Sequence, residues 1–142
     1  MADYYTQFSC ILDLGSPDHV APALALYREL EEALDRDEGA GIGFLAVAAS
    51  DRPGALWISD DAGDGDPEHV IAFALRCAEA FGLTGRWGFT WALTCSKSRL
   101  DGFGGGAQVL DLGQRESLAW TDCDHWLGLQ LAAEADATAP NT

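Results

Sequence analysis

The amino-acid sequence predicts an α+β fold, and three observations carry that prediction. Segments 16–37 and 66–81 have the apolar spacing of amphipathic helices. Both segments begin with the same pattern, in which a capping side chain is followed by proline, an acid, histidine and valine. The segments around them are short and rich in aromatic and branched residues, which is typical of strands. The order is therefore β-α-β-β-α-β followed by a β-hairpin and a helix. Its first part is the ferredoxin-like arrangement, an antiparallel sheet with two helices on one face.

The amino-terminal half supplies three strands and two helices. Residues 4–14 form the first predicted strand. The first helix begins at Ser16 and ends near residue 37, where a run of glycines stops it. Segments 42–49 and 55–59 are predicted to be the two strands of a hairpin. An acidic loop then leads from this hairpin into the second helix.

The carboxy-terminal half supplies a long strand, a hairpin and a last helix. Residues 86–96 alternate between a face of small or polar residues and a face of large apolar ones. The large face, which we expect to belong to the core, carries Trp87, Phe89, Trp91, Leu93 and Cys95. Segments 107–112 and 117–120 form the hairpin, and the last helix starts at residue 122 or 124 and ends at residue 134. An alternative is an α/β sandwich in which this helix covers the second face of the sheet.

The chain length predicts one domain. With 142 residues, of which 48% are hydrophobic, the chain can bury enough apolar surface to fold without disulfides or a metal. We expect residues 1–134 to form a single α+β domain and residues 135–142 to form a flexible tail. The four cysteines lie far apart and form no CxxC pair, so we expect reduced thiols and no zinc site.

Negative charge is concentrated in the first half of the chain. Residues 1–68 hold 15 Asp and Glu against 3 Arg, a net charge of −12, whereas residues 69–142 hold 8 against 5, a net charge of −3. Nucleic acid and anionic membranes repel such a chain, so the expected partner is a host protein with a basic surface. A basic surface that binds nucleic acid is the most abundant example. The alternative is that the acidity serves only solubility.

The same composition predicts a cytoplasmic protein. No apolar run approaches the roughly 18 residues that a membrane span needs. The amino terminus lacks the basic and apolar regions of a signal peptide. We expect no cofactor, because no cofactor-binding motif is present.

Three groups of residues resemble chemical sites without matching one. His19 and His69 each follow an acid, but neighbouring helix residues point about 100° apart, which favours a surface or capping role over a metal site. Segment 60–68 has the composition of a calcium loop without its register, so only weak calcium binding stays open. Cys123 and His125 lack the flanking signature of a nucleophile and its base. We therefore expect no catalysis, and a small metal-dependent or hydrolytic enzyme built on these residues is an alternative.

The most basic stretch of the chain is short. Lys97 and Arg99 precede the glycine-rich segment 102–106, and Arg86 begins the same strand. This glycine-rich segment lacks the features of a phosphate-binding loop. The stretch can form an anion-binding or partner-contact corner, and the alternative is that its charges balance nearby acids.

The acidic residues of the first helix and of the following loop carry the functional hypothesis. Acids spaced along a helix and an adjoining loop can present negative charges at separations similar to those of duplex phosphates, about 1.7 Å of axis per charge. They would then occupy a basic groove that normally holds nucleic acid. The residues expected to act as phosphate substitutes are Glu29, Glu31, Glu32, Asp35, Asp60, Asp61, Asp64 and Asp66. The alternative is an ordinary charged helix face.

Two parts of the chain carry a family resemblance: the run DPEHVIAFALRCAEAFGLTGRWGFTWALTCSKSRLDGFGGGAQVLDL and the segment 120–126. Through them the chain resembles a family of small acidic proteins, of no assigned activity, that bacteriophages and plasmids carry. The helix followed by Trp87, Gly88 and Trp91 is also similar to the YubB-like ferredoxin-like domain of mobile elements. The longer motif of that second family is absent here.

This resemblance implies a setting on mobile elements. Short acidic cytoplasmic proteins of such elements are similar in character to anti-defence proteins, among them CRISPR inhibitors and restriction decoys. We therefore expect this chain to bind and inhibit a host nucleic-acid-targeting complex through its acidic surface. Its Trp-rich second half differs from known decoys, so a docking surface around Trp57 or around residues 97–99 stays open. The alternative is a non-catalytic interaction or regulatory domain that uses an aromatic surface.

Overall fold

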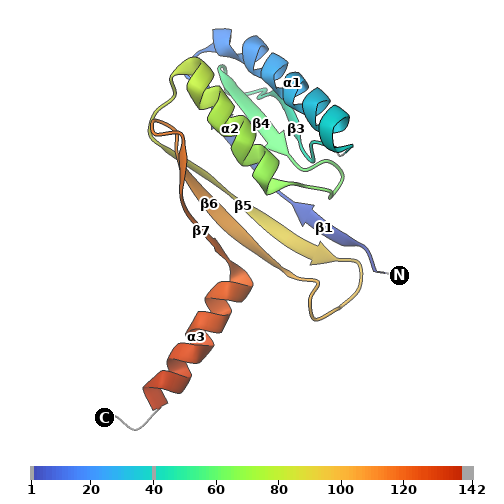
Figure 1. Ribbon diagram of the computed structural model, residues 1–142, viewed down its shortest axis with the longest axis vertical. Helices are drawn as coiled ribbons and strands as arrows, with labels where there is room; N and C mark the ends of the chain where they lie inside the picture. The colour runs from blue at the N-terminus through green and yellow to red at the C-terminus, as the bar shows by residue number, and fades with distance from the viewer. Residues whose placement is uncertain (1, 40, 139–142) are drawn as a thin grey trace.

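The computed structural model describes residues 2–39 and 41–138 and confirms the α+β class (Figure 1). A single 3-10 turn, Pro17–His19, precedes the first helix. The strands and helices, in chain order, are β1 (Tyr4–Gln7), β2 (Ser9–Asp13), α1 (Val20–Glu38), β3 (Leu45–Ala48), β4 (Ala55–Ser59), α2 (Pro67–Phe81), β5 (Arg86–Cys95), β6 (Gly104–Asp111), β7 (Glu116–Asp122) and α3 (Cys123–Thr138).

The strands form two antiparallel sheets instead of the single sheet that the sequence predicts. One sheet has the order β1-β5-β6-β7 and the other has the order β2-β4-β3. The predicted first strand, residues 4–14, is divided between them at Phe8. Because of this division the strand order does not clearly match a ferredoxin-like sheet, and that finer prediction is not confirmed. The helices α1 and α2 lie side by side over the three-stranded sheet (Figure 1).

Asp60 causes the break in the first strand. One oxygen of its carboxylate accepts a hydrogen bond from the Phe8 backbone N–H at 2.9 Å, and the other accepts one from the Gly63 N–H at 2.7 Å. The Asp60 N–H in turn donates to the Phe8 carbonyl at 3.1 Å. Both backbone groups of Phe8 are therefore bonded to one residue of the β4–α2 loop, and the chain changes sheets at this point.

The helix ends follow the sequence pattern. The Ser16 hydroxyl accepts from the Asp18 N–H, and the Asp66 carboxylate accepts from the N–H groups of Glu68 and His69. These bonds satisfy amide groups that a first helical turn leaves without a partner inside the helix. At the other end, Gly39 caps α1 in the left-handed conformation.

The core lies beneath the two helices and includes side chains of both sheets, among them Phe89 and Leu110 of the four-stranded sheet. The largest fully buried side chains are Phe44, Phe73, Leu12, Leu14, Leu56, Ile58, Leu110, Val70 and Cys77. The apolar spacing of α2 predicts a core face of seven residues, Val70, Ile71, Phe73, Ala74, Cys77, Ala78 and Phe81. Five of these are buried, whereas Ile71 and Phe81 are only partly buried. Each fully buried large apolar side chain stabilises the fold by about 1.5–3 kcal/mol.

The predicted core face of the long strand is only half covered. Phe89 is buried, Trp87 and Trp91 are partly buried, and Leu93 retains 37% of its exposure. Cys95, the last residue of this face, is partly buried, so burial on the face is greatest at Phe89 and least at Leu93. The start of α2 does not close over Leu93, and a surface pocket lies between them.

The last helix does not cover the second face of the sheet. Helix α3 begins directly after β7, packs mainly against β6 and β7, and extends away from both sheets (Figure 1). Its backbone is helical to Thr138, four residues beyond the predicted end, so it overlaps the first half of the predicted tail. Residues 139–142 of that tail lie outside the described residues.

We predict that Asp60→Ala destabilises the fold by about 1.5–3 kcal/mol, because two charge-assisted backbone hydrogen bonds are lost at the junction of the two sheets. Urea unfolding followed by circular dichroism measures this loss. The matched control is Asp61→Ala, which removes the neighbouring exposed carboxylate and is expected to change stability by less than about 0.5 kcal/mol. Equal effects of the two substitutions would contradict the role given to Asp60.

Candidate partner-binding surfaces

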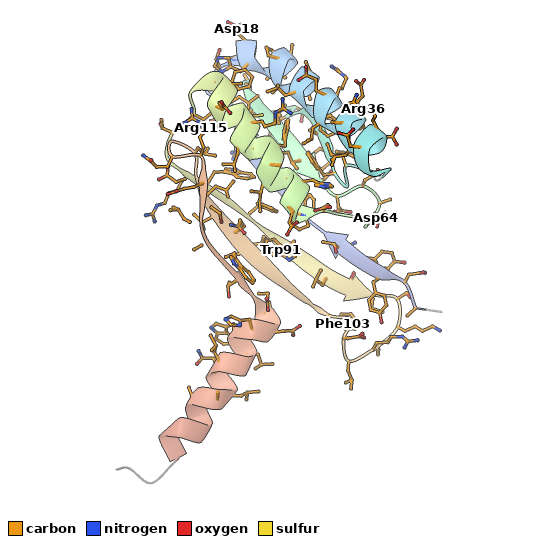
Figure 2. All side chains as sticks on the ribbon, viewed as in Figure 1. Asp18, Arg36, Asp64, Trp91, Phe103 and Arg115 are labelled. Carbon is orange, nitrogen blue, oxygen red and sulfur yellow. The ribbon has the colours of Figure 1, made fainter. Side chains whose placement is uncertain are left out.

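Four of the predicted acidic residues converge on one surface hollow. Glu31 of α1 faces Asp61 and Asp64 of the β4–α2 loop and Asp66 at the start of α2, across a hollow of about 320 Å³. The floor of the hollow is formed by Gly41, Ile42, Gly43 and Gly65. We call this site the acidic hollow. Figure 2 shows Asp64 on the loop that runs between the helices and β1.

Backbone hydrogen bonds hold the acidic loop against β1. The Thr6 N–H donates to the Gly63 carbonyl at 2.8 Å, and the Gly65 N–H donates to the Thr6 carbonyl at 3.0 Å. Gly65 has no room for a side chain, because a Cβ atom there would lie 2.6 Å from the Thr6 oxygen and from the Phe8 ring. The glycines of this loop thus allow a close backbone approach. The loop is an ordered part of the fold, so its carboxylates keep defined positions.

The pKa of Tyr27 responds to negative charges of the acidic hollow. Burial, followed by the negative charges of Glu31 and Asp61, raises the pKa of Tyr27 to about 12. Its hydroxyl donates to the Phe44 carbonyl at 2.6 Å, and Glu31 follows it by one helical turn. Carboxylates from two separate elements therefore act on the same phenol, which means that their charges reinforce each other.

Little within the fold neutralises these carboxylates. In the part of the chain that the structure describes, no Lys or Arg side chain lies within ion-pairing distance of Glu31, Asp61 or Asp64. Asp66 is 3.2 Å from Nδ1 of His69, and the same nitrogen also faces the Ile42 carbonyl at 2.8 Å. The hollow is thus a site of unpaired negative charge, and a cationic group from outside can approach it favourably.

The other four predicted acids have separate positions. Glu29 pairs with Arg76 of α2 at 3.7 Å, and both side chains are largely exposed. Glu32 and Asp35 are exposed on α1. Asp60 is only partly exposed, and both of its oxygens bind backbone N–H groups. Asp60 therefore has a structural role, which the sequence does not reveal because its partner Phe8 lies 52 residues away, and its action as a phosphate substitute stays a prediction.

A second surface lies on α3, which extends away from both sheets (Figure 1). Its exposed large apolar side chains are Trp126, Leu127, Leu129 and Leu131. We call this set the apolar arm. Leu118 and Trp120 of β7 are also exposed, but Trp120 lies on the other face of the sheet, in a pocket with Pro67, Glu68 and Leu93. On α3, Trp126 and Leu129 lie on one side of the helix and Leu127 and Leu131 lie on another, so the helix is apolar on more than one side. The sequence analysis missed the arm, although the run WLGLQLAA lacks the polar face of an ordinary surface helix.

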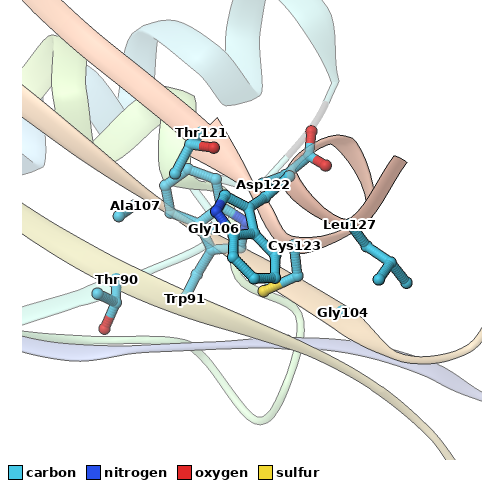
Figure 3. A pocket seen from close by; sticks show the side chains of 11 residues that line it. Thr90, Trp91, Gly104, Gly106, Ala107, Thr121, Asp122, Cys123 and Leu127 are labelled. Atoms are coloured by element: carbon cyan, nitrogen blue, oxygen red, sulfur yellow. The ribbon is translucent and has the colours of Figure 1, made fainter. Parts of the chain in front are cut away.

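A pocket of about 640 Å³ lies where the arm joins the sheet (Figure 3). Thr90 of β5, Ala107 of β6 and Thr121 of β7 contribute its small side chains, and Cys123 and Leu127 of α3 close one side. These small residues belong to the face of the long strand and hairpin that is opposite the core. Because these side chains are small, the pocket stays open, and its lining is almost entirely apolar.

The two histidines at the helix starts have matching contacts. Nδ1 of His19 lies 2.6 Å from the Leu14 carbonyl, and Nδ1 of His69 lies 2.8 Å from the Ile42 carbonyl. The His19 ring also stacks on Phe81 with a centroid distance of 4.5 Å. Nδ1 of each ring therefore donates a hydrogen bond to a backbone carbonyl, and this bond connects the start of a helix to an earlier loop. Among the residues that the structure describes, no group of three His, Cys, Asp or Glu side chains is placed to hold a metal ion.

The remaining candidate groups are all exposed. Cys123 and His125 lie at the start of α3, and no hydrogen bond among the described residues joins their side chains. Lys97 and Arg99 lie in the exposed turn after β5, whereas Arg86 lies at the other end of that ten-residue strand, so the basic corner does not include it. Trp57 is partly exposed, and its indole N–H donates to the Ser9 hydroxyl at 2.7 Å.

Comparison with known proteins adds no family to this description, because no family model, curated protein or solved structure matches the chain. No helix among residues 2–39 and 41–138 combines the length and the apolar character that crossing a membrane requires.

We predict that the four thiols differ sharply in reactivity. Burial raises the pKa of Cys77 to about 12 and that of Cys10 to about 11, from an ordinary value of 9.0. A rise of three units lowers the thiolate fraction about a thousandfold, and the thiolate is the form that reacts. Cys123 is exposed and should be alkylated first by iodoacetamide. Peptide mass spectrometry over time measures the four rates.

The same reaction in unfolding concentrations of guanidinium is the control, in which all four rates should become similar. Labelling of Cys77 in the folded protein as fast as that of Cys123 would contradict the burial of the α2 core face.

Proposed function

We propose that this protein is a non-catalytic binding protein whose acidic hollow and the neighbouring acids of α1 occupy a basic, nucleic-acid-binding surface of a host protein. The convergence of Glu31, Asp61, Asp64 and Asp66 on one hollow supports this proposal most directly. These side chains come from a helix and from a loop that backbone hydrogen bonds hold in place. A preorganised set of charges loses little conformational entropy when it binds.

The distribution of charge supports the same proposal. The half of the chain that contains the hollow has a net charge of −12, and its acids lie close enough to reinforce one another. Such a surface steers a basic partner toward itself and repels nucleic acid. A protein that covers a basic groove in this way blocks nucleic-acid binding, which is the action expected of an inhibitor of a nucleic-acid-targeting defence complex, of the anti-CRISPR or anti-restriction kind.

We further propose that the two sheets are one ferredoxin-like arrangement, divided at Phe8. Strands β1 and β2 are consecutive, and only Phe8 separates them. If they are counted as one strand, the order becomes β5, β1 with β2, β4 and β3, with β6 and β7 added beyond β5. This arrangement would agree with the resemblance to YubB-like domains of mobile elements, on which the proposed bacteriophage or plasmid setting depends.

A second candidate function is supported by the apolar arm. Trp126 is 58% exposed, and tryptophan is among the residues that contribute most to protein interfaces. A protein that binds its partner through this surface would act as an interaction domain, and its binding would depend little on salt.

We predict that Glu31→Lys, Asp61→Lys and Asp64→Lys together weaken binding to a basic partner. The test captures bacterial lysate proteins on the immobilised chain at about 50 mM and about 200 mM salt, with double-stranded DNA as competitor. Captured proteins should be released by the higher salt and displaced by the DNA, because both compete for the same basic surface. The triple variant should weaken capture on the order of tenfold or more.

The matched control reverses three exposed acids elsewhere, with Asp51→Lys, Glu79→Lys and Glu116→Lys. It changes the net charge by the same amount and should retain capture. A purified captured nuclease is then assayed for DNA cleavage with each protein. Equal losses for both triple variants would show that only net charge matters. Binding that DNA cannot displace would exclude occupation of a nucleic-acid surface.

A further inference from the structure

The apolar arm is unusually exposed for a surface that has no partner. Trp126 alone exposes on the order of 150 Å², given that a tryptophan can bury about 250 Å². The three leucines of the arm add to this area, and they are at least 50% exposed. A typical monomer has no apolar patch larger than about 300–600 Å², and patches of that size usually bind something.

The helix of the arm needs neighbours on more than one side. A helix that is apolar all round is normally buried. The sheet of the same chain contacts only the first turns of α3, where Trp126 and Leu127 line the pocket. Leu129 and Leu131 lie farther along the helix, where the described chain provides nothing that covers them. The fold therefore leaves most of α3 to be covered by another molecule.

The charges of the arm identify the class of that molecule. Between residues 117 and 133 the only acidic residues are Asp122 and Asp124, and there is no Lys or Arg. A basic protein groove or a nucleic acid finds no complementary charge there, and an anionic membrane surface would require basic residues beside the apolar ones. The arm therefore fits a partner surface that is apolar and nearly uncharged. The arm of a second copy is itself such a surface.

Electrostatic repulsion also favours contact between two arms over other contacts between copies. Each chain has a net charge of −15, and most of that charge belongs to residues 1–68. Figure 1 shows α1, which carries many of these acids, at one end of the molecule and α3 at the other. Two copies that meet through α3 keep their acidic ends as far apart as the shape of the chain allows.

We propose that a second copy of this chain docks on the apolar arm and forms a two-fold symmetric dimer in which α3 and β7 of the two copies pack against each other. In a two-fold contact the same patch serves both partners, so one self-complementary apolar surface is sufficient. A stable dimer needs about 800 Å² per partner, and the apolar wall of the pocket at the base of α3 adds to the area that the arm contributes. Strand β7 is also the edge of its sheet, so its outer backbone groups lie beside the patch. This proposal does not depend on the function proposed for the acidic hollow.

The full-length chain is tested by light scattering after gel filtration over a range of micromolar concentrations. The expected mass is about twice the 15.1 kDa of one chain. Leu129→Glu with Leu131→Glu should give the mass of one chain, because each substitution places a charge in the contact. The matched control is Leu100→Glu, at an apolar residue that is 107% exposed in the turn after β5, and this variant should stay dimeric. A wild-type monomer throughout, or a dimer in the double variant, overturns the proposal.

A measurement on the unaltered chain avoids dependence on the folding of the variants. Hydrogen exchange of the amides in residues 126–133 should slow as the protein concentration rises, whereas exchange in α2 should stay the same. Exchange in α3 that does not change with concentration overturns the proposal. Salt separates this contact from the acidic hollow, because screening the repulsion between copies strengthens the dimer and weakens the binding of a basic partner. Failure of either proposal is therefore recognised without reference to the other.

Discussion

The carboxylate of Asp60 fixes the geometry on which the rest of the molecule depends. By accepting hydrogen bonds from Phe8 and Gly63, it ends the pairing of β1 with one sheet and allows β2 to begin in the other. The same two bonds attach the acidic loop to the junction of the sheets. One side chain thus decides both where the strand changes partners and where Asp61 and Asp64 are presented. A carboxylate at this position of the loop therefore serves the structure itself.

The clustering of carboxylates opposes folding, and the core beneath them offsets that effect. Like charges on Glu31 and Asp61 repel, and both side chains line the same hollow. Below the hollow, Phe44 and Phe73 pack with Tyr27 at ring-centroid distances of 5.2–6.0 Å. Such aromatic packing adds about 0.5–1.5 kcal/mol per pair beyond burial of area. Repulsion between the carboxylates therefore remains in the folded protein, and a cationic partner that binds there relieves it.

The sequence predicts features that depend on neighbouring residues and misses those that depend on distant contacts. The caps at Ser16 and Asp66 were predictable because a cap bonds within three residues. The break at Phe8 was not predictable, since its cause is 52 residues away. Glu31 was a candidate from the sequence, but its meeting with Asp61 depends on how α1 packs over the sheet. The exposure of Leu93 likewise depends on how α2 packs over β5. The alternation of residues within one strand carries no information about that packing.

The two surfaces obey different physical chemistry and lie on different elements of the fold, and this separation has a consequence for binding. The acidic hollow acts through charge and loses strength with salt, whereas the apolar arm acts through removal of apolar area from water. A pair of copies joined by their arms would present two acidic hollows facing outward. If a partner has two basic sites at a matching distance, one site binds the first hollow of the dimer, and the second site then binds the other hollow within the same complex. This second step is intramolecular, so the overall affinity increases without any new contact. A partner with one basic site would gain nothing from the pairing. The arm would then select for repeated or extended basic surfaces, such as those that follow a nucleic-acid strand, because only these offer two sites to one dimer.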